Sequence, residues 1–273
     1  MHETPSGKLY QEAFTANLLC NKGIIKSKFS KSWLKQPPAP DIVVDKFGIE
    51  VTNALIKEDG QQDAFKRQVL SEDTYKDAMD TYTKIQNNNK TAPNFSVESI
   101  IGMPVALDKN ARSIEEMVKK VIERIKEKNS KDWLDVTFYT KRGLFIQAYF
   151  AVFPFNNGGF LKGLEDIRLE FLNTKFDVLY FFHNLGLYIF KRTATKYQCI
   201  PLMQSEINET IFATVSSLTP ADVCMSPAGH SGLIKKMPDL IKWQKQEEQN
   251  ISSAKVTPEE GLLDFLDLYL SKN

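Results

Sequence analysis

The sequence predicts an α/β fold of the α+β kind, in which a mixed central β-sheet is flanked by helices. Three observations lead to this prediction: a hairpin pattern at 40–52, an amphipathic helix at 113–128, and two nearly continuous apolar runs at 176–182 and 186–190. Such runs are typical of strands buried on both faces. The 273-residue chain, with 42% hydrophobic and 25% charged residues, can bury a large core and has an ordinary globular composition.

Charge and cysteine content restrict the class of protein. The net charge is only +1, so binding to nucleic acid would have to depend on local basic patches. The 3 cysteines are far apart and odd in number, which is unlike a disulfide framework and typical of a reducing setting. The sequence shows neither a signal-peptide pattern nor an apolar segment that could span a bilayer. We therefore expect a cytoplasmic protein that does not enter a membrane.

Residues 7–21 predict the first helix, because their apolar side chains recur on one helical face. Glu12 is the one acidic residue of this helix and lies beside the apolar stripe. Taken alone, it is typical of a solvated helix glutamate.

A basic segment at 22–35 follows, with five lysines and no acidic residue. Its alternating pattern at 23–29 predicts a strand with Lys26 and Lys28 on one face. Together with Lys31 they are candidates for an edge that binds nucleic-acid phosphates, since clustered lysines offset the repulsion between nearby acids and a polyanion. The alternative is a solvated basic surface.

The hairpin places its acidic and its apolar residues on opposite faces. A turn at 46–47, with Gly48 taking the backbone angle that other residues avoid, pairs Asp41 with Thr52. Asp41 and Glu50 then share a face that the rest of the fold must leave open. Two carboxylates on adjacent strands suit Mg²⁺, which prefers one or two such ligands and otherwise keeps its waters. The opposite face consists of Ile42, Val44, Ile49 and Val51.

The order Pro-Asp at 40–41, then Ile-Glu-Val-Thr at 49–52, resembles the core motif of the PD-(D/E)XK nuclease superfamily. The resemblance implies a restriction-endonuclease-like αβββαβ core. It also implies that Asp41 and Glu50 bind a divalent metal, Mg²⁺ or Mn²⁺, and that a lysine two residues after the glutamate orients the attacking water. Thr52 stands at that lysine's position.

The resemblance adds two further candidate residues. In the superfamily the helix before the sheet often lends a glutamate to the metal site, which makes Glu12 a candidate. In branches with Glu-Val-Thr in the strand, a lysine on the following helix replaces the missing one. In helix 113–128, which starts with a capping box, Lys128 lies nearest the edge of the apolar stripe. The alternative for Lys128 is solvation or interaction with the negative helix end.

The rest of the chain predicts alternating helices and strands. Residues 57–98 are polar with helical character and are expected to be an insertion beside the site. The run at 144–155 is rich in aromatic residues and its type is left open. The other expected elements are a strand at 133–139, a helix at 160–172 and strands at 176–182 and 186–190.

One large domain, or one domain with an appendage, is expected. Residues 1–200 would form the nuclease-like domain, and 201–273 a mostly helical extension packed on it. Helices are expected at 206–218, 232–248 and 257–270. The last of these is apolar on most sides, so it should dock on the domain or on a second copy, giving a homodimer.

The first functional hypothesis is a Mg²⁺- or Mn²⁺-dependent endonuclease that hydrolyses phosphodiester bonds in DNA or RNA. Asp41 and Glu50 would hold the metal, Glu12 would assist, and Lys128 would orient the water or steady the phosphate. By resemblance, such proteins often act in restriction, phage defence, repair or mobile elements.

Two alternatives compete with an enzyme. One is a catalytically degenerate module of the same fold that binds nucleic acid or a partner protein without cleavage; Thr52 favours it, whereas Asp41 and Glu50 favour the enzyme. The other is a structural or regulatory subunit. Acids that point apart, or that arginine or lysine seals, would indicate the latter.

Overall fold

The computed structural model describes residues 6–54, 114–148, 157–183, 186–223, 225 and 227–252. Within these ranges the helices are α1 (Ser6–Asn21), α5 (Ile114–Lys128), α6 (Asn157–Leu172), α7 (Gln204–Ser217) and α8 (Pro227–Ser252). The strands are β1 (Ile42–Val44), β2 (Phe47–Asn53), β3 (Lys141–Ala148), β4 (Val178–His183), β5 (Gly186–Lys191) and β6 (Gln198–Pro201).

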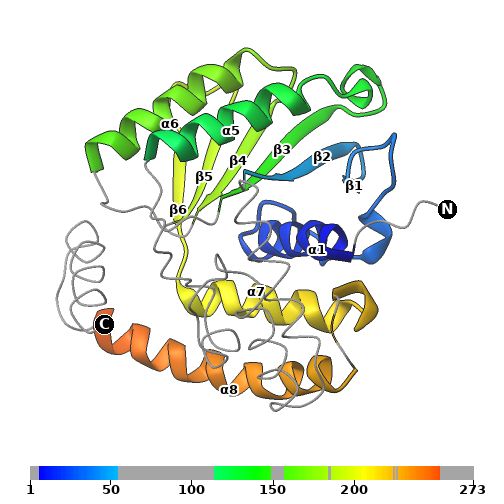
Figure 1. Cartoon of the computed structure of the whole chain (residues 1–273), viewed down its shortest axis with the longest axis vertical. Coiled ribbons are helices and arrows are strands. Elements are labelled where there is room, and N and C mark those ends of the chain that lie inside the picture. Colours follow the sequence, from blue (N-terminus) through cyan, green and yellow to red (C-terminus); the bar gives the residue numbers. More distant parts are fainter. Residues whose placement is uncertain are drawn as a thin grey trace, which may run out of the picture.

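The described strands form one mixed sheet in the order β1-β2-β3-β4-β5-β6 (Figure 1). Strands β2, β3 and β4 are parallel, and β1, β5 and β6 pair antiparallel at the two sides. Helices α5 and α6 cover one face, α1 covers the other, and α7 and α8 lie beyond α1. The expected α+β fold with a helix-flanked mixed sheet is confirmed.

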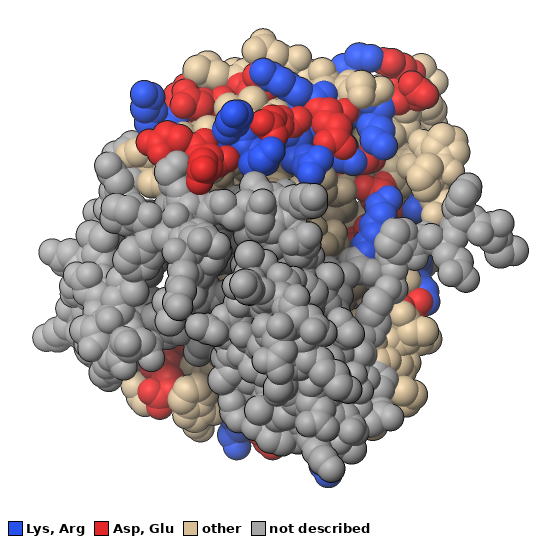
Figure 2. Space-filling view, viewed as in Figure 1, with Lys and Arg blue, Asp and Glu red and all other residues tan. Residues whose placement is uncertain are grey.

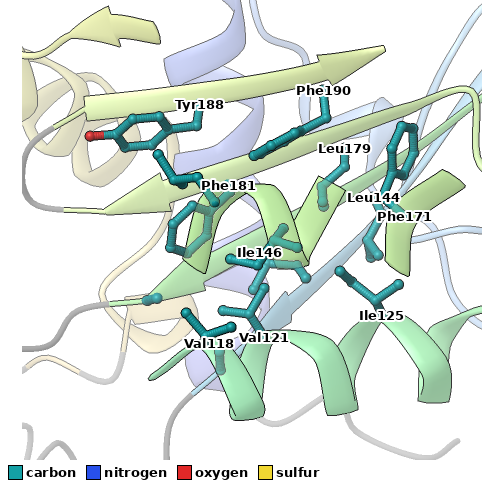
Figure 3. Packing of buried hydrophobic residues seen from close by; sticks show 14 of the residues in the cluster. Val118, Val121, Ile125, Leu144, Ile146, Phe171, Leu179, Phe181, Tyr188 and Phe190 are labelled. Atoms are coloured by element: carbon teal, nitrogen blue, oxygen red, sulfur yellow. The ribbon is translucent and has the colours of Figure 1, made fainter. Parts of the chain in front are cut away.

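One hydrophobic core lies between the sheet and helices α5 and α6, and the apolar stripe of α5 forms part of it (Figure 3). Val118, Val121 and Ile125 point at Leu144 and Ile146 of β3. All five are buried, which confirms the helix predicted from its spacing.

A second core lies between the sheet, α1 and α7. Phe14 and Leu18 of α1 pack in one cluster with Phe182 of β4 and Ile207 of α7. On its other side α1 meets α7 through polar contacts, among them Asn17 Nδ2 donating to Thr214 Oγ1 over 3.3 Å. Helix α1 is therefore shared between the sheet and the C-terminal helices.

The hairpin has its predicted apolar face and a different register, whereas Asp41 and Glu50, expected on an open face, are buried. Val44 pairs with Phe47, so the turn is at 45–46, one residue before the expected position. Asp45, with a φ of 53°, takes the left-handed backbone conformation that the sequence predicts for Gly48. The pairing shifts by two residues, which exchanges partners but leaves every side chain on its face. The predicted apolar face packs in the second core: Ile42, Val44, Ile49 and Val51.

Two predicted strands are wrong. After α1, Gly23 has a φ of 66°, and the amides of Ile24 and Ile25 return to Leu19 O at 2.9 and 3.1 Å, so 23–29 begins with a helix cap and continues without a strand.

The expected strand at 133–139 starts instead with the short 3-10 helix η2 (Asp132–Asp135). This turn buries Trp133 and Leu134 consecutively, which an alternating strand cannot do.

Other elements complete the comparison. The segment 144–155, whose type the sequence leaves undecided, starts within strand β3. Strand β6 was not predicted. Helices α7 and α8 lie at the predicted 206–218 and 232–248 and are longer. The expected insertion at 57–98 and helix at 257–270 lie outside the described residues, so the homodimer stays a prediction. Across the described ranges, no helix combines the length and hydropathy needed to cross a membrane.

Candidate functional site

Three carboxylates from α1 and the β1–β2 hairpin are buried. Glu12, Asp41 and Glu50 are 2%, 3% and 4% exposed, and they are the acids that the sequence singled out. An ionised carboxylate is costly to bury unless it is paired or hydrogen-bonded. The contacts of each oxygen therefore determine what this site can do.

Asp41 precedes β1 and is held from two sides. Its Oδ2 accepts a hydrogen bond from the backbone amide of Val51 at 2.8 Å, and its Oδ1 lies 2.7 Å from Lys8 Nζ. Ile42 pairs with Ile49, so the register continued by one residue puts Asp41 across from Glu50. The shifted turn thus sets the two acids opposite each other, where the predicted register had set Asp41 opposite Thr52.

Glu12 shares the same lysine. Its Oε1 lies 3.3 Å from Lys8 Nζ, one helical turn earlier on α1, and no described residue gives this oxygen a hydrogen bond. Burial and the adjacent negative charge of Asp41 raise the pKa of Glu12 to about 8, against the opposing effect of Lys8. Burial lowers the pKa of Lys8, but the hydrogen bond to Asp41 and the negative charge of Asp41 outweigh this effect, so the pKa of Lys8 is raised.

Glu50 is contacted by α5 and the segment that follows it, whereas Asp41 is contacted by α1. Trp133 Nε1 donates to its Oε2 over 3.2 Å, and its Oε1 lies 3.2 Å from Lys128 Nζ and 3.6 Å from Lys131 Nζ. Lys128, the lysine that the resemblance implies beside the strand glutamate, therefore contacts Glu50. Lys126, two residues earlier on α5, lies 3.4 Å from Glu170 Oε2 instead.

Asp41 and Glu50 follow one pattern. In each carboxylate a neutral N–H group fixes one oxygen, the Val51 amide or the Trp133 indole, while the other oxygen faces lysine. The side chains of Lys8 and Lys131 are 36% and 43% exposed, so solvent reaches both ion pairs. The side chains of Asp41 and Glu50 themselves are only 5% exposed, so lysine covers both acids. Acids covered by lysine are the arrangement expected of the structural or regulatory alternative.

The donor set fits a hard divalent cation. Carboxylate oxygens are the ligands that Mg²⁺ and Mn²⁺ prefer, and Mg²⁺ commonly uses one or two of them. The buried Glu12 Oε1, which accepts no hydrogen bond from a described residue, is a further available oxygen. Among the described residues there is no group of three or more His, Cys, Asp or Glu side chains placed to hold a metal.

The three lysines proposed to bind nucleic acid lie elsewhere. Lys26, Lys28 and Lys31 are exposed and follow the C-terminal end of α1, whereas Lys8 and Glu12 lie in its N-terminal half. Lys31 Nζ lies 2.6 Å from Asp222, which offsets part of the basic charge. Figure 2 shows acidic and basic side chains interspersed over α5 and α6. Binding of nucleic acid through these lysines stays a prediction.

Sequence reasoning missed Lys8, Lys131 and Trp133. Lys8 could have been found, because a lysine four residues before a helix glutamate is a common pair. The sequence predicts a strand at Trp133. In the structure Trp133 lies in the 3-10 turn η2, and its hydrogen bond to Glu50 depends on this turn.

Comparison with known proteins finds no matching family model, curated protein or solved structure.

Proposed function

We propose that this chain is a divalent-metal-dependent nuclease with a restriction-endonuclease-like core that hydrolyses phosphodiester bonds in DNA or RNA. The contact between Lys128 and Glu50 carries the proposal. The motif has Thr52 where such an enzyme needs a lysine, and helix α5 brings another ammonium group to the same glutamate.

The residues divide the chemistry between them. Asp41 and Glu50, assisted by Glu12, would hold Mg²⁺ or Mn²⁺, which supplies Lewis acidity and lowers the pKa of bound water. The Val51 amide and the Trp133 indole keep the acids oriented. The positive charge of Lys128 would steady the scissile phosphate or orient the attacking water.

Cleavage assays test the proposal. Purified protein is incubated with plasmid, single-stranded DNA and RNA under Mg²⁺ and then Mn²⁺. We expect Glu50→Gln to lose cleavage and Lys128→Met to lose about 100-fold. Lys120→Met is the matched control, because Lys120 lies on the same helix and pairs with the exposed Glu123. Equal cleavage by Glu50→Gln and wild type would contradict the proposal.

A binding module without cleavage is the second candidate. The observation that favours it is Lys8, whose ammonium already satisfies Asp41 where a metal would bind. Such a module would bind nucleic acid with an affinity that falls steeply with salt and would leave it intact under both metals.

A further inference from the structure

The ammonium of Lys8 lies between two buried acids, 2.7 Å from Asp41 Oδ1 and 3.3 Å from Glu12 Oε1. We propose that Lys8 is an internal counter-ion that a divalent cation displaces, so that metal binding is an exchange of ammonium for metal. This inference rests on the metal site of the proposed function and adds to it a residue that sets the metal affinity.

The charges leave room for a stronger cation. Lys8 offers the two acids a single positive charge, whereas a divalent metal offers two. The two contacts of the Lys8 ammonium group are also unequal. Asp41 Oδ1 lies close to it, whereas Glu12 Oε1 receives no hydrogen bond from the described residues. A divalent ion would attract both oxygens more strongly.

Lys8 is also able to leave. Its side chain is 36% exposed, whereas that of Lys128 at the other acid is only 15% exposed. A lysine stem has four rotatable bonds and can carry its charge into solvent without movement of the backbone. The oxygens it would release are those that no backbone or indole N–H group holds. Without metal, Lys8 compensates the buried negative charge of Asp41.

Calorimetric titration with Mn²⁺ on the full chain tests the exchange. Lys8→Met and Lys8→Gln remove the competing charge, and we expect both to bind Mn²⁺ about 5-fold or more tightly than wild type, the size of a partly exposed ion pair. Lys120→Met is the matched control, since Lys120 is also 36% exposed and pairs with a carboxylate on its own helix. Equal or weaker binding by both Lys8 variants overturns the proposal.

A second measurement uses the wild type and does not depend on the folding of a variant. An acetylating reagent is applied with and without saturating Mn²⁺, and modification of each lysine is read by mass spectrometry. Acetylation of Lys8 should rise several-fold with Mn²⁺, while that of Lys120 stays constant. If Mn²⁺ binds and cleavage occurs but Lys8 does not respond, the exchange is wrong and the nuclease proposal stands. If Lys8 responds without any cleavage, the exchange is supported and the nuclease proposal fails.

Discussion

At the scale of single residues, the site depends on which carboxylate oxygens are held by neutral donors and which face a cation. Trp133 is the clearest case, because its indole donates to Glu50 while its ring packs against Tyr139 and Phe176. One side chain thus joins the hydrophobic core to the proposed catalytic glutamate.

Replacing Trp133 by Phe should separate these two roles. The aromatic packing is largely kept, whereas the hydrogen bond to a buried charge is lost. We expect the free energy of unfolding to fall by about 2 kcal/mol, measured by urea denaturation. Trp243→Phe is the control, because Trp243 is 54% exposed and should change stability little. Equal effects at the two positions would contradict the role of the indole.

Glu12 makes stability depend on pH. The folded chain holds its proton up to about pH 8, whereas an ordinary glutamate releases it near 4.5. Between these values the folded state binds more protons than the unfolded state, so stability falls as pH rises through the interval. Lys8 stays charged throughout, because its pKa is raised above 10.5.

Glu12→Gln should remove this dependence. From about pH 5 to about pH 9, we expect wild type to lose stability relative to the variant by a few kcal/mol, at about 1.4 kcal/mol per unit of pKa shift. Urea denaturation across this range measures the difference. Parallel pH profiles for the two proteins would show that Glu12 has an ordinary pKa in the fold.

At the scale of elements, α5 and α6 approach closely at Gly163. A Cβ added there would overlap Cγ2 of Val118, a buried and β-branched side chain that cannot easily turn away. Alanine usually favours a helix over glycine, but here the overlap should outweigh that gain.

Gly163→Ala should therefore destabilise the protein by about 1–3 kcal/mol, read as a lower thermal midpoint. The control is Gly232→Ala on α8, where a Cβ meets nothing within 4 Å and helix propensity alone should stabilise by about 1 kcal/mol. Val118→Ala should reduce the cost of Gly163→Ala in the double variant. Additive effects would contradict direct contact between the two positions.

Helices and strands with a strong hydrophobic periodicity were predictable from the sequence, whereas contacts between elements far apart in the sequence were not. The stripe of α5 and the faces of the hairpin follow from spacing alone. The predicted hairpin register was wrong because the local sequence does not favour a turn with Asp45 in the left-handed region. Lys128 beside Glu50 was expected only through the family resemblance. Lys8 beside Asp41 depends on how α1 packs against β1, and no local pattern encodes it.

At the scale of the whole molecule, the sheet and the C-terminal helices share one core. Ile207 of α7 is 8% exposed and packs in the cluster that contains Phe182 and Leu187 of the sheet. Helix α8 is tied to α7 in turn, for example by Asn208 Nδ2 donating to Gln244 Oε1 over 2.7 Å. The predicted boundary at residue 200 therefore separates segments that are packed together.

This packing predicts that the described helices and sheet unfold as one cooperative unit. Circular dichroism and tryptophan fluorescence should give the same thermal midpoint, since Trp33 and Trp133 pack in the two cores of the sheet and Trp243 lies on α8. Ile207→Ala should lower both midpoints together, because deleting a buried isoleucine to alanine costs about 2–5 kcal/mol. Leu161→Ala is the control, since Leu161 is 55% exposed on α6 and its loss should shift neither midpoint. Two separate transitions, with only the one seen by Trp243 moved by Ile207→Ala, would show that α7 and α8 fold independently of the sheet.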